Sequence, residues 1–444
     1  MSRWKVVAGV VVAGMLSTGL ALGVSSGASA GPAEPSVPAG SGNGSVRLFA
    51  TNPTLVRAGE RVSIPVDAVC ATARHRVCSA VVRFSERNAA GAWHSASAPS
   101  STMLRFDLSA PASRAAANAS GGAVEYAVGA SGGGTNATLG RAAAPLRFYV
   151  VPSMPVVRVP QVPFGQVRTG RTVLYLPWGS GPNAAGLIAP DESAGEGPSA
   201  FDVGRDGSIT LLDPVQDRMG VWRSGKRLRS VHLPLTGRAD VSVTPSGRAF
   251  VLDLSGASRT VRSVDAEGRV ATVADLGNDL GSEIRTTGEQ PFVLREPLDA
   301  WTPLGPGAPM SIGQPSGGGG QLLRIATESS VRLGLLSGGT VRNPVELRSA
   351  DRFGEIALAE ADGAGGYVAV LHMWRGGSNA ADQYQVVRVF GHEVTESFAI
   401  ADLHIVGGPP LSRFRLGPDG NLYALTTASD GARVVRFDLR GGAR

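Results

Sequence analysis

The sequence contains six histidines, the side chains best suited to metal binding or proton transfer near neutral pH. They are His75, His94, His232, His372, His392 and His404. No two have the spacing of metal ligands, and no H-E-x-x-H motif occurs. Spacing does not exclude ligands gathered from distant segments, but we expect structural roles for His372, at the end of an apolar strand, and for His404. The sequence thus predicts no catalytic set, no metal site and no cofactor.

Two short motifs resemble enzyme signatures but lie in the wrong context. Residues 220–227 (GVWRSGKR) approach a P-loop, yet Arg227 stands where a hydroxyl must reach magnesium. Residues 129–133 (GASGG) match G-x-S-x-G, a motif that needs a strand-to-helix turn. Both stretches are predicted to join β-strands, so we expect neither nucleotide binding nor serine hydrolysis.

The N-terminus has the pattern of a secretory signal peptide. Arg3 and Lys5 precede an apolar stretch over residues 6–24, and Ala28-Ser29-Ala30 forms a small-x-small cleavage site. The alternative is a single anchoring helix, but the stretch is interrupted by glycines and is no longer than the roughly 20 apolar residues that a span needs. We expect cleavage of residues 1–30 and a secreted, extracellular location.

Two other modes of membrane anchoring are not supported by the sequence. No cysteine precedes Cys70, so the lipid attachment site of a bacterial lipoprotein is missing. Residues 233–237 (LPLTG) match a sortase signal but lie in mid-chain, whereas such a signal must lie near the C-terminus. We therefore expect no stable membrane anchor after cleavage.

Cys70 and Cys78 are the only cysteines. In an exported chain they are expected to form a disulfide that closes a short loop and stabilises the fold by roughly 2–3 kcal/mol. The alternative is a metal site that adds His75 to both thiolates, but no fourth ligand lies nearby in the sequence.

The composition favours many short strands joined by turns, because glycine (60) and proline (29) are abundant. The formal net charge is +6, and Lys5 and Lys226 are the only lysines among the basic residues. The densest basic cluster is Arg223, Lys226, Arg227 and Arg229. We interpret it as a solvated face and expect no nucleic-acid partner.

The chain divides into segments of different pattern. Residues 31–45 are rich in Gly, Pro and Ser, and are expected to be a flexible lead-in. Residues 46–151 contain short alternating strands, which predict a β-sandwich similar to immunoglobulin-like or fibronectin-like modules. Residues 152–170 carry spaced prolines and predict a stiff, extended linker.

From residue 171 to residue 444 the sequence repeats itself. The clearest unit spans residues 197–225, with an Asp206-Gly207 turn between apolar strands, and it recurs around Gly247 and Gly420. Weaker copies surround Gly288 and Gly363. These units resemble NHL-type β-propeller repeats, and the arginine-rich, Ala/Gly-rich composition is similar to that of secreted actinobacterial proteins. The resemblance implies an all-β protein with a propeller of five or six blades, closed by residues 172–176 beside residues 434–437.

Residues 297–321 depart from the repeat and predict a long structureless loop over one propeller face. Trp301 and Met310 in this loop are candidate ligand-binding residues, and Trp178, at the entrance to the repeats, is a third. A disordered insertion is the alternative for the loop, and a core position is the alternative for Trp178.

Two functions fit these observations. The first is a secreted, non-catalytic protein that binds an extracellular protein or glycan through a propeller face. The second is an extracellular propeller enzyme, a metal-dependent lyase or lactonase-like hydrolase, which requires at least three His, Asp or Glu side chains to converge on the propeller axis. The missing catalytic set favours the binding protein.

Overall fold

The computed structural model describes the chain from Ser45 to Leu439 with internal gaps. The residues outside the description are 1–44, 51–53, 61, 72–79, 88–92, 100–103, 108–121, 133–134, 141–144, 189–194, 236, 256–257, 278–280, 296–299, 306–310, 317–319, 376–380, 401–405, 407–409 and 440–444. The expected signal peptide, Cys78, Met310 and His404 lie outside the described residues. The described part contains no helix that is long and apolar enough to cross a membrane.

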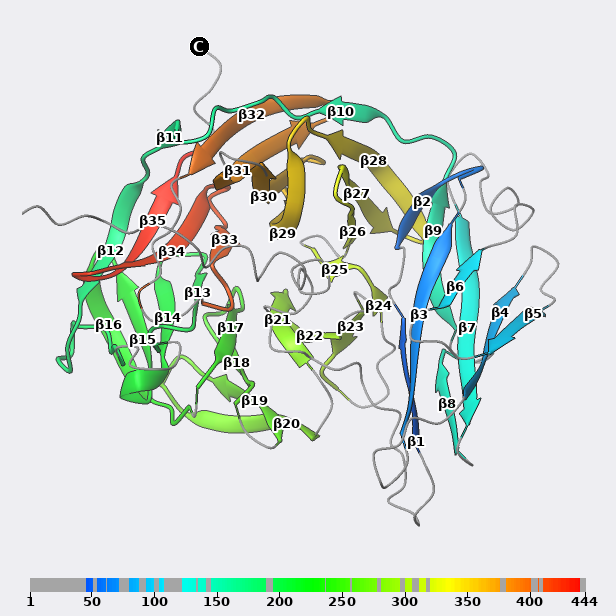
Figure 1. The fold of residues 1–444 in the computed structure, drawn as a ribbon. Coiled ribbons are helices and arrows are strands. Elements are labelled where there is room, and N and C mark those ends of the chain that lie inside the picture. The colour runs from blue at the N-terminus through cyan, green and yellow to red at the C-terminus, as the bar shows by residue number, and fades with distance from the viewer. Residues whose placement is uncertain are drawn as a thin grey trace, which may run out of the picture.

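The described residues form β-strands and one short 3-10 helix, η1 (Pro214–Gln216). The strands between Arg171 and Phe437 form six sheets arranged around a ring (Figure 1). This is a β-propeller of six blades, so the predicted all-β propeller is confirmed, and of the two blade counts that the sequence allowed the structure has the larger.

Each blade takes its strands in chain order, from the inner strand outward. Blade 1 contains β13 (Ala200–Val203), β14 (Ile209–Asp213), β15 (Arg218–Arg223) and β16 (Lys226–His232). Blade 2 contains β17 (Ala239–Val243), β18 (Ala249–Asp253), β19 (Arg259–Val264) and β20 (Val270–Gly277). Blade 3 contains β21 (Gly281–Thr287), β22 (Gln290–Arg295), β23 (Ala300–Pro303) and β24 (Ser311–Ile312).

The second half of the ring follows the same order. Blade 4 contains β25 (Gln314–Pro315), β26 (Gln321–Ala326), β27 (Ser330–Ser337) and β28 (Thr340–Arg348). Blade 5 contains β29 (Arg352–Ala361), β30 (Tyr367–Arg375), β31 (Ala381–Phe390) and β32 (Glu393–Ile400). Blade 6 contains β33 (Phe414–Leu416), β34 (Leu422–Ala428) and β35 (Gly431–Phe437).

The turn between the first two strands of a blade is set by local chemistry. Gly207 and Gly420 adopt positive φ angles of 76° and 73°, which glycine reaches without steric cost. The aspartate before each glycine accepts a hydrogen bond from the backbone N–H two residues on, at 3.0 Å from Asp206 to Ser208 and 3.1 Å from Asp419 to Asn421. The Asp-Gly pairs in the sequence therefore mark true hairpins.

The ring closes with a strand from before the first blade. β12 (Arg171–Pro177) pairs antiparallel with β35, with Thr172 opposite Val435 and Leu174 opposite Val434. It supplies the fourth strand of blade 6, which confirms the predicted closure.

The segment before β12 runs along the outside of the ring (Figure 1). β10 (Val156–Arg158) pairs parallel with β28, and β11 (Val167–Arg168) pairs parallel with β32. We call residues 156–177 the strap, because they add an outer strand to three successive blades. The stretch that the sequence predicted as a linker is therefore part of the outer surface of the ring.

The N-terminal strands form two further sheets. One contains β1 (Ser45–Ala50), β3 (Ser63–Ala71) and β6 (Leu104–Asp107). The other contains β2 (Leu55–Arg57), β4 (Ala80–Arg87), β5 (Trp93–Pro99), β7 (Gly122–Gly132), β8 (Thr135–Leu139) and β9 (Leu146–Val151).

These sheets pack directly against the propeller. One apolar cluster contains Tyr126 and Phe148 from the N-terminal sheets together with Leu323 and Leu336 from blade 4. Beside it, Glu346 of β28, with a side chain only 2% exposed, accepts a hydrogen bond of 2.6 Å from Arg57. The shared core and the buried charge hold the N-terminal sheets against blade 4.

The prediction of a structureless loop over residues 297–321 is wrong, because these residues include β23, β24 and β25. Short strands separated by Gly/Pro-rich stretches do not show the period-2 alternation by which a strand is recognised. Trp301 lies within β23 and is fully buried at 0% exposure, so its ring belongs to the core and does not reach a propeller face.

Candidate functional site

Charged side chains from five blades meet where the inner strands of the ring face one another. Aligned on the turn glycines Gly207, Gly247, Gly288 and Gly420, the inner strands of blades 1, 2, 3 and 6 place a polar residue five positions earlier. These residues are Asp202, Ser242, Glu283 and Arg415. We define the axial cluster as Asp202, Asp240, Glu283, Arg285, Glu360, Ser412 and Arg415.

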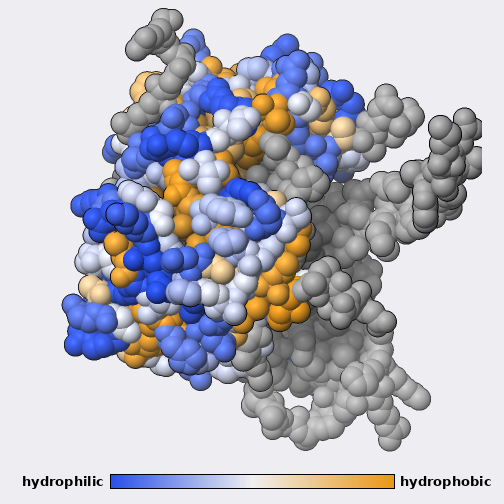
Figure 2. Space-filling model, turned by 90° about the vertical axis from the view of Figure 1, so that its left-hand side faces the viewer, coloured by the Kyte–Doolittle hydropathy of each residue, from blue (hydrophilic) through white to orange (hydrophobic). Residues whose placement is uncertain are grey.

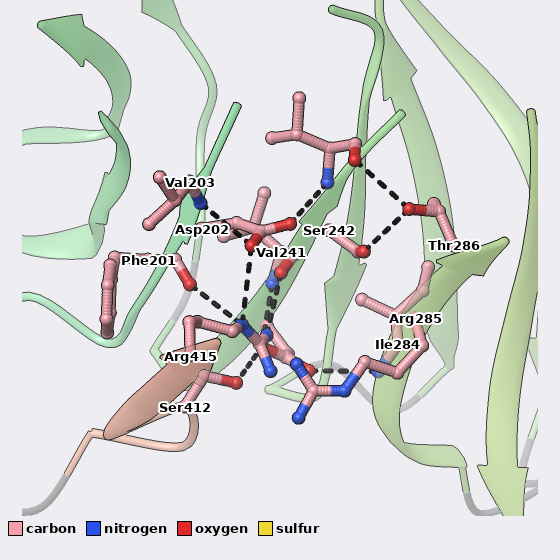
Figure 3. A network of polar contacts seen from close by, with 12 residues as sticks. Phe201, Asp202, Val203, Val241, Ser242, Ile284, Arg285, Thr286, Ser412 and Arg415 are labelled. Carbon is pink, nitrogen blue, oxygen red and sulfur yellow. Dashed lines mark hydrogen bonds and ion pairs between the residues drawn. The ribbon is translucent and has the colours of Figure 1, made fainter. Parts of the chain in front are cut away.

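Arg415 of β33 is the central cation of this cluster, with a side chain 3% exposed. Its Nη2 donates to Asp240 Oδ1 and to the Val241 carbonyl, both at 2.9 Å, and its Nε donates to the Phe201 carbonyl at 3.1 Å (Figure 3). Its Nη1 lies 3.7 Å from Glu283 Oε1. One guanidinium therefore joins blade 6 to blades 1, 2 and 3.

Asp240 of β17 is fully buried, and backbone and side-chain donors surround its carboxylate. Oδ1 accepts from the Val241 N–H at 2.8 Å, from Arg415 and from the Ser412 hydroxyl. Oδ2 accepts from the Ile284 N–H at 2.9 Å. The donors come from β17 itself, from β21 and from the segment around β33, so the carboxylate ties three chain segments together.

A second cation, Arg285 of β21, crosses to the other side of the ring. Its Nη2 lies 2.5 Å from Glu283 Oε1 and 3.8 Å from Glu360 Oε1 of β29. Both side chains are largely buried, at 12% exposure for Arg285 and 19% for Glu360. The pair connects blade 3 with blade 5 through charge alone.

Burial dominates the electrostatics of the carboxyl groups. Burial, followed by the repulsion of Glu283, raises the pKa of Asp240 to about 7, and burial raises the pKa of Asp202 to about 6. Burial also raises the pKa of Glu360. Burial opposes the charge of Arg285, but the surrounding carboxylates, Glu283 first, hold its pKa above the ordinary value.

The geometry limits what the cluster can do chemically. Two carboxyls that titrate near neutrality are candidates for proton exchange. However, Asp240 already accepts bonds from four donors, and Asp202 accepts from the N–H groups of Val203 and Val243 at 2.8 and 2.6 Å. Among the residues that the structure describes, no group of three or more His, Cys, Asp or Glu side chains is placed to hold a metal ion.

The sequence-predicted residues lie away from this cluster. Trp178 donates from Nε1 to the Ala428 carbonyl at 2.8 Å and is partly buried against blade 6. His372 lies on β30, the second strand of its blade, where Nε2 is 3.1 Å from Asp382. Trp301 is in the core, and Met310 lies outside the described residues, so a ligand-binding role for these candidates stays a prediction.

Cys70 lies on β3, but its predicted partner Cys78 lies outside the described residues, so the disulfide stays a prediction.

The aspartates that end the second strands of blades 1 and 2 form ion pairs with an arginine on the third strand of the same blade. Asp213 lies 3.1 Å from Arg218, and Asp253 lies 2.7 Å from Arg262. Arg218 also donates to the Ala184 carbonyl, which fixes the segment that leads into blade 1.

The sequence patterns did not predict the axial cluster, because its residues include no histidine and do not have the spacing of metal ligands. A usable signal was present, because the fifth residue before the turn glycine is polar in blades 1, 2, 3 and 6, although it is Leu358 in blade 5. Arg285 and Asp240 then follow from the period of a strand, since each lies two residues from one of those positions and shares its face.

A hollow of about 590 Å³ lies outside the ring, between the strap and the last two blades. It is lined by Arg168, Thr169, Gly170, Arg171, Glu396, Arg436, Phe437 and Asp438. Most of its charges are paired, for example Arg168 with Glu396 at 2.5 Å and Arg436 with Asp438 at 2.7 Å. Of these pairs, Arg168 with Glu396 joins the strap to blade 5.

No protein-family model matches the sequence, and no curated protein gives a significant match. A structure of catalytically inactive virginiamycin B lyase from Staphylococcus aureus is similar at 8% identity, with a TM-score of 0.35, over 56% of this chain and 98% of that chain. A luciferin-regenerating enzyme is similar at 10% identity, with a TM-score of 0.36, over 58% of this chain and 96% of that one.

A protein of unknown function from Bacteroides thetaiotaomicron matches 92% of this chain and 100% of its own, at 10% identity and a TM-score of 0.34. These TM-scores are low, so the propeller assignment rests on the six sheets themselves.

Proposed function

We propose that the chain is an exported, non-catalytic binding protein that recognises an extracellular protein or glycan through its propeller. In this proposal residues 1–30 are removed on export and residues 31–45 are a lead-in. Residues 46–151 form an immunoglobulin-like sandwich, residues 152–170 connect it to the ring, and residues 171–444 form a propeller of NHL type.

One observation carries the proposal, namely that the carboxylates of Asp202 and Asp240 and two of the three nitrogens of Arg415 already form hydrogen bonds, most of them to neighbouring blades. Arg415 contacts three blades, and Asp240 has four donors. Interlocked buried charges of this kind hold a fold in register and leave few lone pairs for a substrate. The partner is then expected to bind to the outer surfaces of the blades.

A pull-down from the native cell surface and culture medium tests the proposal. Tagged mature protein, starting at Gly31, is expected to capture a protein or glycan in a saturable way. Untagged mature protein is expected to displace it. Capture that is not displaced, or none at all under several growth conditions, would contradict the proposed binding function.

The second candidate is an extracellular propeller enzyme, a metal-dependent lyase or lactonase-like hydrolase. It is favoured by the raised pKa values of Asp202 and Asp240, because such groups can exchange protons near neutral pH. Elemental analysis of the purified protein separates the two. Stoichiometric calcium or zinc would favour the enzyme, whereas a metal-free protein that still captures its partner favours the binding function.

A further inference from the structure

The outer edges of the six blades are not equivalent. The strap adds β10 to blade 4 and β11 to blade 5 as fifth strands, and it supplies the outermost strand of blade 6. Blade 1 ends at β16 and blade 2 ends at β20, and no described strand pairs with either outer edge. An unpaired edge presents backbone N–H and C=O groups to any extended chain that can reach it.

The strap shows where such a blade accepts a fifth strand. β10 pairs with residues 346–348 of β28, and β11 pairs with residues 399–400 of β32. In both outer strands this is the last stretch, beyond a register shift in the pairing with the preceding strand. The added strands therefore sit on the regular part of the edge, after the bulge.

β16 has the same arrangement without the added strand. Its pairing with β15 shifts between Val221 and Trp222, so that Leu228 is left out, and then runs regularly over residues 229–232. The N–H of Leu233 donates to the Asp217 carbonyl at 2.8 Å. By the alternation of an antiparallel ladder, the N–H and C=O groups of Ser230 and His232 point away from β15, and both residues are exposed.

The side chains around this edge are basic. Lys226, Arg227 and Arg229 lie on β16, and no carboxylate pairs with any of them in the part of the chain that the structure describes. Arg227 donates to the Pro182 carbonyl at 2.7 Å and Arg229 to the Asp265 carbonyl at 2.6 Å, contacts that orient the guanidinium groups without cancelling their charge. Figure 2 shows this side of the ring, where hydrophilic side chains are abundant and hydrophobic ones lie between them.

The edge of blade 2 differs in charge. The arginine before β20, Arg269, is paired with Asp265 at 2.6 Å and Glu267 at 3.0 Å, and β20 itself carries Asp275. Charge complementarity therefore distinguishes β16 from β20, although both edges are open. Where the strap is added to blade 5, the added strand supplies the cation Arg168 and the blade supplies the carboxylate of Glu396. On β16 the blade supplies the cations, so the added strand should supply the carboxylates.

We propose that blade 1 binds an extended, acidic segment of a partner protein, which adds to the β16 edge at residues 229–232 as a fifth strand. The added strand runs parallel to β16, as β10 and β11 run along β28 and β32. Backbone hydrogen bonds to Ser230 and His232 would hold the strand, and carboxylates would contact Lys226, Arg227 and Arg229. The inference rests on the proposed binding function and names its surface and the chemistry of its partner.

The test uses the full mature chain and a fluorescein-labelled peptide of alternating valine and glutamate, with fluorescence anisotropy as the readout. Ser230→Pro removes an N–H that points to solvent, so the ladder with β15 stays intact. The matched control is Thr272→Pro, at an exposed position of the β20 edge whose N–H also points outward. Circular dichroism is the check that both variants keep their β structure.

We expect Ser230→Pro to weaken peptide binding by about tenfold or more, equivalent to about 1.4 kcal/mol. Thr272→Pro should change it by less than about twofold. A peptide with alternate N-methylated amides should also lose binding, because it cannot form the ladder. Lys226→Glu should reduce affinity most at low salt.

Several results would overturn the proposal. Equal binding of the N-methylated peptide, or full binding by Ser230→Pro, would show attraction of an anionic polymer to a basic surface. A dimer in sedimentation that Ser230→Pro dissociates would assign the edge to a second copy of the chain. If the peptide does not bind while the pull-down captures a partner, the edge proposal fails and the proposed function stands.

Discussion

Replacing Arg415 with methionine keeps the length of the side chain but removes the central cation of the axial cluster. The substitution breaks the hydrogen bonds to Asp240 and to the carbonyls of Phe201 and Val241 in a site where the side chain is 3% exposed. Removal of one partner from a buried ion pair costs about 3–5 kcal/mol, because the other charge stays buried without compensation. We therefore expect a loss of about 4 kcal/mol in the free energy of unfolding.

Thermal unfolding followed by tryptophan fluorescence, to which the buried Trp222 and Trp301 contribute, measures this loss. With roughly 2 °C per kcal/mol for a large domain, Tm should fall by about 8 °C. Arg205→Met, at an exposed arginine, is the control and should change stability by less than about 0.5 kcal/mol. Combining Arg415→Met with Asp240→Asn should recover about 1–3 kcal/mol, because the orphaned charge is removed. A Tm for Arg415→Met within about 2 °C of the unchanged protein, with no recovery in the double variant, would refute this account of the cluster.

Three further predictions concern other parts of the molecule. Burial raises the pKa of Asp240 to about 7 in the folded protein. The protonated carboxyl therefore contributes to the free energy of unfolding at low pH, below the pKa of the unfolded chain, and this contribution is lost as the pH rises through 7. Asp240→Asn removes this titration, and urea unfolding should show the variant gaining roughly 2–3 kcal/mol relative to the unchanged protein between about pH 5 and pH 8. Gly170→Ala should loosen the strap and lower Tm, because a Cβ there would lie 2.5 Å from a methyl group of Val435, whereas Gly181→Ala meets only an ordinary contact at 3.9 Å. Glu346→Ala leaves several arginines without their shared carboxylate, and limited proteolysis should then cut faster between the N-terminal sheets and the ring; equal cutting rates would contradict this role.

The sequence predicts well those elements whose local chemistry is complete within a short stretch. Asp206-Gly207 and the turns around Gly247 and Gly420 mark hairpins because glycine and aspartate act on their own backbone. The closing strand could also be predicted, since residues 172–176 are an apolar strand without a partner before the first repeat. Of the predicted five or six blades the structure has six, because blade 4, in which no copy of the repeat was recognised, still contributes β25, β26, β27 and β28.

Other features depend on contacts that the sequence order hides. β23 and β24 are too short to show a pattern, so Trp301 looked like a loop residue while it is a core residue of blade 3. The axial cluster draws Asp240 and Arg415 together from blades far apart in the chain, and the hydrogen bond between them spans 175 positions. No spacing rule for short motifs reaches that far, whereas the aligned polar positions in the repeats do.

The strap also determines when the propeller ring can close during folding. The Tyr175 hydroxyl donates to the Asp430 carbonyl, 255 residues away in the chain. Blade 6 cannot be completed until β35 is available to pair with β12. A newly made chain therefore emerges with β12 unpaired until β35 has appeared. Contacts of such long sequence separation slow folding, and until they form the unpaired strand edges are prone to aggregation. Truncation before β35 would thus leave β12 without its partner and blade 6 incomplete, whereas β10 and β11 would keep β28 and β32 as partners.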